Sequence, residues 1–267
     1  MLWFAVKRRQ FVEYQYFLCT TRDKGKKFCL YVFGEKESMQ QHLTREGVKY
    51  LLAPFLWTLI MMIVFFAAAG RFDIPRAWLA FGTHFIGAVL GALLMYRFAP
   101  ELANQRASAR QGTKGWDKAI LTIYFFLLLL GIPLTAGLDV GRYQWSNLQS
   151  TGLGLVCYSL FFLLFHWAML TNKFFEGTSR IQTDRDHRVI RSGPYVYVRH
   201  PGYVAMIFAS VADPLIIGSL YSLIPSCLAV GVILVRTGLE DRMLRNELEG
   251  YAEYAATVKY RLIPGIW

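Results

Sequence analysis

Four runs of about 20 residues without a charged side chain constrain this chain more than any other feature of its sequence. A helix needs about 20 mostly apolar residues to cross the hydrocarbon core of a bilayer. The composition agrees, because 18% of the residues are charged, whereas ordinary soluble domains carry about 25%. We therefore predict four transmembrane helices, and not a soluble helical bundle, at residues 51–70, 77–96, 119–138 and 151–171.

A longer apolar stretch, residues 201–235, has Asp213 as its only charged side chain. It is too long for one crossing, and Asp213-Pro214 interrupts it because proline disfavours helix in the residue before it. We predict a hairpin with arms at 204–212 and 219–235 and a turn that Asp213 caps. An apolar stripe beyond it predicts a tail helix. The predicted fold is all-α: a multi-pass integral membrane protein with four transmembrane helices, a C-terminal helical hairpin and a cytoplasmic tail helix.

The basic residues sort to alternate sides of these spans. Lysine and arginine number ten in residues 1–49, two in 71–76, five in 97–118, one in 139–150, six in 172–200 and five from 236 onward. The positive-inside rule then predicts that the N- and C-termini are both cytoplasmic. The net charge of +11 lies against anionic headgroups, so we expect the membrane and no nucleic acid as its partner. We expect this membrane to be a bacterial inner membrane, or the endoplasmic reticulum if the chain is eukaryotic.

Composition divides the chain into three parts. Residues 1–49 form a basic N-terminal segment without an assigned role, with a strand predicted at 28–33. Residues 50–171 hold the transmembrane helices. Residues 172–267 hold a loop, the hairpin and the tail, and we expect this part to be the catalytic region. The four cysteines form no CxxC pair and no histidine-rich spacing is present, so no metal site is predicted.

The densest group of polar and aromatic side chains is HRVIRSGPYVYVRHPGY, residues 187–203, where a loop enters the membrane. Its Gly193-Pro194 pair predicts a tight turn. A histidine before a proline has an extended backbone, which leaves its backbone groups available to a ligand. By composition alone, the same segment also fits a basic and aromatic connector at the membrane interface.

Arg236 and Glu240 lie four residues apart, on one face of a predicted helix. They are expected where the last hairpin arm leaves the membrane, at the depth where His200 enters it. An ion pair within the helix is one interpretation. In the functional interpretation, Arg236 binds the carboxylate of an acceptor, and Glu240 binds an amine or a ribose hydroxyl.

Several motifs follow one another in the last third of the chain: NKFFEGTSRIQTDRDHRVI, GPYVYVRHPGY, a hydrophobic hairpin, RTGLED and a final GYAEYAATVKYRLIP. Together they resemble the isoprenylcysteine carboxyl methyltransferase family over about residues 172–267. That family is similar to phospholipid methyltransferases and, more distantly, to membrane sterol reductases. The upstream segment PELANQRASARQGTKGWDK resembles a loop of its bacterial members.

The resemblance implies a membrane methyltransferase that uses S-adenosylmethionine and takes a lipid-like acceptor, such as an isoprenylcysteine, from the bilayer. The cofactor contacts that it implies are His187, Arg188, Val189, Ile190, Tyr195, His200, Pro201, Gly202, Tyr203 and Glu240. The implied catalytic residues are Arg236 and Glu240, and Arg236 would bind the acceptor carboxylate. The chain departs from the family pattern at Asp241, where a second glutamate is common, and at Ala205, where glycine is common.

The chemistry is compatible with more than one activity. An ionised carboxylate needs no general base to accept a methyl group from a sulfonium, so positioning and exclusion of water suffice. A phospholipid N-methyltransferase would need a base for its amine, and Glu240 or His200 would supply it. The sequence is also compatible with an NADPH-dependent membrane reductase of the sterol type and with a membrane protein that has no enzymatic activity.

Overall fold

The computed structural model describes residues 15–22, 26–33, 42–106 and 112–267. The chain divides into two units, Met1–His42 and Leu43–Trp267, which are described separately. In the first unit, β1 (Gln15–Arg22) and β2 (Lys26–Phe33) pair antiparallel, with Gln15 opposite Phe33. The strand predicted at 28–33 is therefore confirmed as part of β2.

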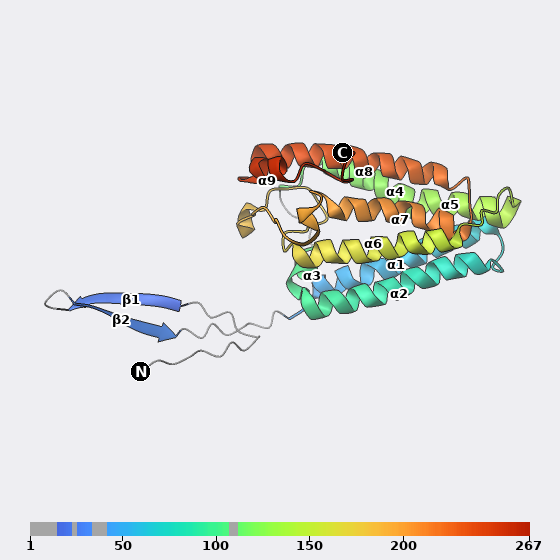
Figure 1. The fold of residues 1–267 in the computed structure, drawn as a ribbon. Coiled ribbons are helices and arrows are strands. Elements are labelled where there is room, and N and C mark those ends of the chain that lie inside the picture. The colour runs from blue at the N-terminus through green and yellow to red at the C-terminus, as the bar shows by residue number, and fades with distance from the viewer. Residues whose placement is uncertain (1–14, 23–25, 34–41, 107–111) are drawn as a thin grey trace. The chain divides into compact units, whose positions relative to one another are not determined.

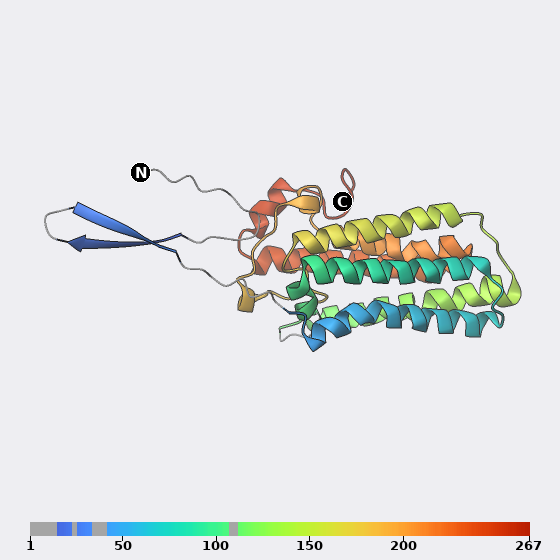
Figure 2. The same ribbon diagram turned by 90° about the horizontal axis from the view of Figure 1, so that it is seen from below.

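The second unit is a bundle of antiparallel helices (Figure 1), and Figure 2 shows the same arrangement from below. Within the described residues, five helices are long and apolar enough to cross a membrane: α1 (Arg45–Ala69), α2 (Pro75–Phe98), the span Gly115–Tyr143, α6 (Thr151–Thr171) and α8 (Leu223–Glu247). The third span consists of α4 (Gly115–Phe126), a π-helical segment (Leu127–Gly131), α5 (Ile132–Ala136) and a second π-helical segment (Gly137–Tyr143). The shorter helices are α3 (Pro100–Arg106), α7 (Pro201–Ile217) and α9 (Tyr251–Thr257). The predicted multi-pass integral membrane fold is confirmed.

Local chemistry sets the helix ends. The Thr44 hydroxyl accepts a hydrogen bond from Gly47 N at 3.2 Å and caps α1. Helices α2 and α7 begin with Pro75 and Pro201, a position where the missing N–H would have no partner within the helix. Helix α7 ends at Ile217 and is followed by Gly218, whose φ of 88° is left-handed and therefore favours glycine.

The hairpin differs from the prediction at Asp213. Helix α7 continues through Asp213 and Pro214 to Ile217, so Asp213 caps no turn. Its carboxylate is buried in the bundle, 2.8 Å from Nε2 of His84 on α2. Proline is tolerated inside a membrane helix because neighbouring groups satisfy the freed backbone. The prediction was wrong because His84 lies 129 residues away, where no local pattern shows it.

Helix α8 also differs from the prediction. It runs unbroken from Leu223 to Glu247, so the arm predicted at 219–235 and the beginning of the predicted tail helix are one helix. Arg236 and Glu240 therefore lie within α8, beyond the part of it that is purely apolar. The separate tail helix is α9, which follows a turn at Gly250 with a φ of 75°.

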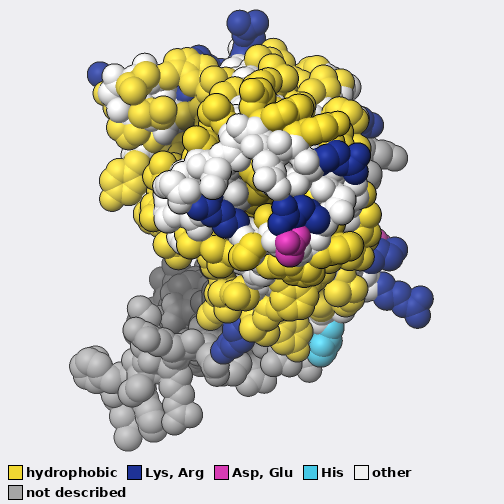
Figure 3. All heavy atoms as spheres, turned by 90° about the vertical axis from the view of Figure 1, so that its right-hand side faces the viewer, with side chains coloured by type: hydrophobic (Ala, Val, Ile, Leu, Met, Phe, Trp, Pro, Cys, Tyr) yellow, Lys and Arg dark blue, Asp and Glu magenta, His cyan; other side chains and the backbone are white. Residues whose placement is uncertain are grey.

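Hydrogen bonds between the segments that connect the helices show which of these segments lie at the same end of the bundle. At the end that carries residues 172–200, here called the loop end, Lys114 N donates to Ser179 O at 3.2 Å. At the opposite end, the Arg76 guanidinium donates to the Leu148 carbonyl at 2.7 Å. Figure 3 views this opposite end, where hydrophobic side chains surround the charged ones. The segments 97–118 and 172–200, which were predicted to share one side of the membrane, thus share one end of the bundle, and so do 71–76 and 139–150.

Helices α6 and α7 approach closely at Gly154. A methyl group at this position would lie 2.5 Å from Ile216 N and 2.9 Å from Ala212 O. Small residues are typical of such contacts, because membrane helices associate through close packing. This contact fixes α7, and so the cavity residues at its beginning, against α6.

We expect Gly154→Ala to destabilise the protein by about 1–3 kcal/mol, because the added methyl group forces two helix backbones apart. Gly152→Ala on the same helix is the matched control, since nothing lies within 4 Å of a methyl group there. The measurement is thermal unfolding of both purified variants in the same detergent. Equal unfolding midpoints for the two variants would contradict the close packing.

Candidate active site

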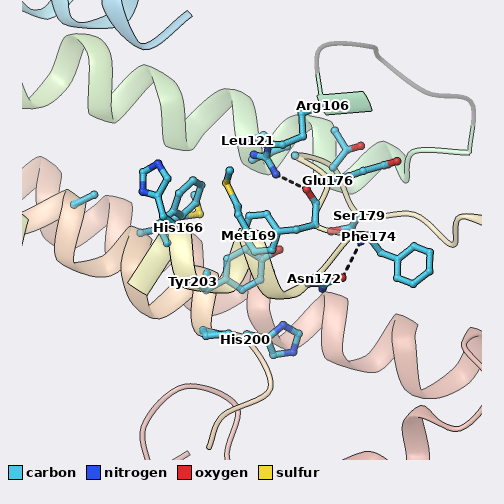
Figure 4. A pocket seen from close by; sticks show the side chains of 18 of the residues that line it. Arg106, Leu121, His166, Met169, Asn172, Phe174, Glu176, Ser179, His200 and Tyr203 are labelled. Carbon is cyan, nitrogen blue, oxygen red and sulfur yellow. Dashed lines mark hydrogen bonds between the residues drawn. The ribbon is translucent and has the colours of Figure 1, made fainter. Parts of the chain in front are cut away.

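A cavity of about 690 Å³ runs from the loop end of the bundle into the space between the helices. Every site residue predicted from the sequence lines it: His187, Arg188, Val189, Ile190, Tyr195, His200, Pro201, Gly202, Tyr203, Arg236 and Glu240. They come from the loop before α7, a short turn at Gly193–Val196, the first turn of α7, and α8. Figure 4 shows part of this lining, with His200 and Tyr203 beside the 172–179 segment.

Glu240 lies at the centre of the polar part of the cavity. Its Oε2 atom accepts hydrogen bonds from the Tyr203 hydroxyl, at 2.5 Å, and from the Ser179 hydroxyl. His200 stacks on Tyr203 with ring centroids 5.5 Å apart, and its Nδ1 lies 4.0 Å from Oε1 of Glu240. The protein thus holds Oε2, while Oε1 accepts no hydrogen bond among the described residues.

Arg236 does not pair with Glu240 in the described part of the chain. Its Nε donates to Oδ1 of Asp117 at 2.7 Å, and Nη2 donates to the Gly177 carbonyl at 3.0 Å. Its guanidinium carbon lies 4.9 Å from the centre of the Tyr203 ring. The ion pair within one helix, which the sequence left open, is therefore replaced by a pair between α8 and α4. Nη1 of Arg236 contacts no acceptor among the described residues.

Sequence reasoning missed the role of Asp117. Its carboxylate is fully buried and also accepts from the backbone N of Ser179 at 2.8 Å and from the Ser179 hydroxyl at 3.0 Å. Asp117 thus ties the beginning of α4 to the loop before α7 and to α8. The only signal was an acidic residue just before an apolar run, and such a residue is also typical of the first turn of a helix.

Asp241 is the second buried carboxylate that the sequence did not assign. Three arginines donate to it: Arg199 at 2.7 Å, Arg245 at 3.1 Å and Arg261 at 3.0 Å. The Tyr251 hydroxyl donates to it at 3.0 Å. Aspartate stands here where the family commonly has glutamate, which keeps the charge and shortens the reach of the side chain. The structure gives this shorter carboxylate partners from the loop, α8, α9 and the C-terminal segment.

The loop before α7 is held by its own ion pairs. Arg180 donates to Glu176 at 2.7 Å and to Asp184 at 2.7 Å. The hydrogen bond with Glu176 is the main cause that raises the pKa of Arg180. Burial lowers the pKa of His187, whose ring lies 4.8 Å from that of Phe174, so this histidine is neutral at pH 7.

Residues 188–190 lie in the loop before α7, with Arg188 exposed and Val189 and Ile190 partly buried. Among the described residues, no hydrogen bond engages their backbone N–H or C=O groups. Val189 and Ile190 pack against an aromatic cluster that contains Tyr195 and Tyr254. The Tyr254 hydroxyl donates to the Tyr195 carbonyl at 2.6 Å, and burial raises the pKa of Tyr254 to about 12. Both hydroxyls therefore stay protonated, since burial also raises the pKa of Tyr195.

The inner part of the cavity is different in character. It is lined mainly by apolar side chains and glycines of α1, α2 and α6, among them Met61, Gly87, Gly91, Phe161 and Phe165. At the loop end the lining is polar and charged, and the two parts form one continuous space. Such a cavity can bind a polar molecule and an apolar chain side by side.

The fold and the cavity together define a class: a multi-pass membrane protein with a polar binding site that is continuous with an apolar interior. Within this class, residues 153–246 match the isoprenylcysteine carboxyl methyltransferase (ICMT) family. The match covers the loop motif GPYVYVRHPGY and the segment RTGLED, and so it supports the resemblance that these motifs carry. The match contains most of α6, all of α7, Arg236 and Glu240, but neither α4 nor α9. Comparison with curated proteins gives no match.

We expect Asp241→Asn to destabilise the protein strongly, because removing one partner of a buried ion pair costs about 3–5 kcal/mol. Asp73→Asn is the matched control, since the Arg71–Asp73 pair lies at the surface with 74% of the Asp73 side chain exposed. Thermal unfolding in detergent measures both. If the two variants unfold at the same temperature, the buried ion pairs of Asp241 do not stabilise the fold as expected.

Proposed function

We propose that this protein is an S-adenosylmethionine-dependent methyltransferase that methylates the anionic head of a lipid-like acceptor, such as the carboxylate of an isoprenylcysteine. The observation that carries the proposal is the continuous cavity, with a carboxylate and an arginine at its polar end and apolar helix faces beyond them. A cofactor from water and an acceptor from the bilayer can meet there. The positive-inside rule supports a cytoplasmic loop end.

The residues at the polar end fit the cofactor chemically. S-adenosylmethionine has an ammonium group and ribose hydroxyls, for which the second oxygen of Glu240 is a suitable acceptor. Its adenine needs backbone partners and an apolar surface, and residues 188–190 offer both beside Tyr195. The cavity volume of about 690 Å³ lies within the range of about 300–1,000 Å³ that is usual for ligand sites.

The cofactor supplies an electrophilic methyl group with a good leaving group. The protein then has to orient the acceptor oxygen and exclude water. Nη1 of Arg236 is available to hold one oxygen of an acceptor carboxylate, so that the other oxygen is free to react. Asp117 fixes the guanidinium from the opposite side at 2.7 Å. Glu240, held by Tyr203 and Ser179, would position the cofactor rather than take a proton.

We expect Arg236→Gln to lower the rate of methyl transfer by about 100-fold or more, the effect of removing a donor that stabilises the reacting charge. Its affinity for S-adenosylmethionine, measured by calorimetry, should change little. Arg97→Gln is the matched control, because Arg97 is exposed and does not line the cavity. If both variants lose transfer equally, or if Arg236→Gln loses cofactor affinity to the same extent, Arg236 does not orient the acceptor.

A ligand-binding experiment separates a methyltransferase from a reductase and from a protein without enzymatic activity. We expect S-adenosylmethionine to raise the unfolding midpoint of the purified protein, because a ligand that binds the folded state stabilises it. NADPH should leave the midpoint unchanged. Stabilisation by NADPH alone would favour a reductase, and stabilisation by neither would favour a protein without this enzymatic activity.

A further inference from the structure

The charges that line the cavity are unevenly compensated. Among the described residues, four of its cations face a carboxylate within 4.0 Å: Lys49 with Glu46, Arg180 with Glu176, Arg199 with Asp241, and Arg236 with Asp117. Two others, Arg106 and the exposed Arg188, have no such partner there. Arg106 is partly buried, so its charge is the one that needs an explanation.

Arg106 is the last residue of α3, and its guanidinium lies in an aromatic setting. Nη1 donates to the Phe175 carbonyl at 2.6 Å, and this is its only protein acceptor among the described residues. The Nε atom is buried and has no hydrogen-bond partner in the part of the chain that the structure describes. The guanidinium carbon lies 5.3 Å from the ring centre of Tyr50, 5.1 Å from that of Phe175 and 6.0 Å from that of Phe165.

This setting leaves most of the binding capacity of Arg106 unused. A guanidinium has five N–H donors and always carries its charge. Aromatic faces attract a cation but accept no strong hydrogen bond from it. A carboxylate can accept two parallel hydrogen bonds from such a group, which is the strongest arrangement that the side chain can form.

Arg106 lies at the junction of the two parts of the cavity. Tyr50 and Phe165, which flank it, belong to α1 and α6, whose faces form the apolar part. On the other side, a methyl group at Gly177 would lie 4.0 Å from Nη2 of Arg106, and the Gly177 carbonyl accepts from Arg236. Figure 4 shows Arg106 near Leu121 and Glu176, across the cavity from His200.

We propose that Arg106 binds the anionic head of the lipid acceptor, while Tyr50, Phe165 and Phe175 contact the first part of its apolar chain. This inference rests on the proposed function and assigns to Arg106 the selection of an anionic acceptor over a neutral one. Arg236 alone is a poor source of anion selectivity, because Asp117 already compensates its charge. Arg106 supplies the uncompensated positive charge that selects a carboxylate.

The test measures binding and needs no turnover. The probe is N-acetyl-S-farnesylcysteine, with its free carboxylate, and its carboxamide is the neutral match. The wild-type protein in detergent should bind the carboxylate about tenfold or more tightly than the amide, as expected for charge-assisted hydrogen bonds. Arg106→Gln should remove this preference and keep the affinity for S-adenosylmethionine.

Arg97→Gln is the matched control, because Arg97 is an exposed arginine beside an aromatic ring, 5.5 Å from Phe98, and does not line the cavity. It should keep the preference of the wild type. If Arg106→Gln does not fold, Arg106→Lys replaces it and should also bind the carboxylate less selectively, since it loses the planar fork.

An equal affinity of the wild type for carboxylate and amide, or a preference that is as strong in the Arg106 variants as in the wild type, overturns the inference. The proposed function fails separately, through the absence of S-adenosylmethionine binding. If the protein prefers the carboxylate in an Arg106-dependent way but does not bind S-adenosylmethionine, the anion site at Arg106 stands and the proposed methyltransferase function is wrong.

Discussion

The buried carboxylate of Asp241 is the interaction on which the polar end of this protein depends. It joins Arg199 of the loop, Arg245 of α8 and Arg261 of the C-terminal segment at distances of 2.7–3.1 Å. Arg199 continues the connection, because it also donates to the carbonyls of Val258 and Lys259 at 2.7 Å. Segments that are far apart in sequence are thereby held around Glu240, the neighbour of Asp241 on α8.

Much of the fold could be predicted because a membrane imposes a simple rule on sequence. Charge-free runs of the length of a bilayer gave the spans, and the helix α6 has the predicted limits of 151–171. The prediction failed where a charged residue inside a span has a distant partner. Asp213 was expected in a turn because Pro214 follows it, whereas His84 on α2 is the group that it contacts.

In the site, too, local sequence motifs predicted the residues, whereas contacts between residues far apart in sequence were missed. The loop motif and the Arg236–Glu240 spacing predicted residues that all line one cavity. The partner of Arg236 was missed, since Asp117 is 119 residues away and only the packing of α4 against α8 brings them together. Arg106 was overlooked for a related reason: its importance comes from the absence of a carboxylate near it among the described residues, which sequence alone does not show.

The central proposal is that the cavity binds S-adenosylmethionine beside a lipid carboxylate and that the methyl group passes from the cofactor to this carboxylate. It is tested most directly by incubating the purified protein with methyl-labelled S-adenosylmethionine and a lipid extract, followed by mild alkaline treatment of the labelled lipid. We expect label to enter the lipid and to be released by alkali as methanol, because a methyl ester is hydrolysed under these conditions. Label that resists alkali would indicate methylation of an amine, and an absence of labelled lipid would contradict the claim altogether.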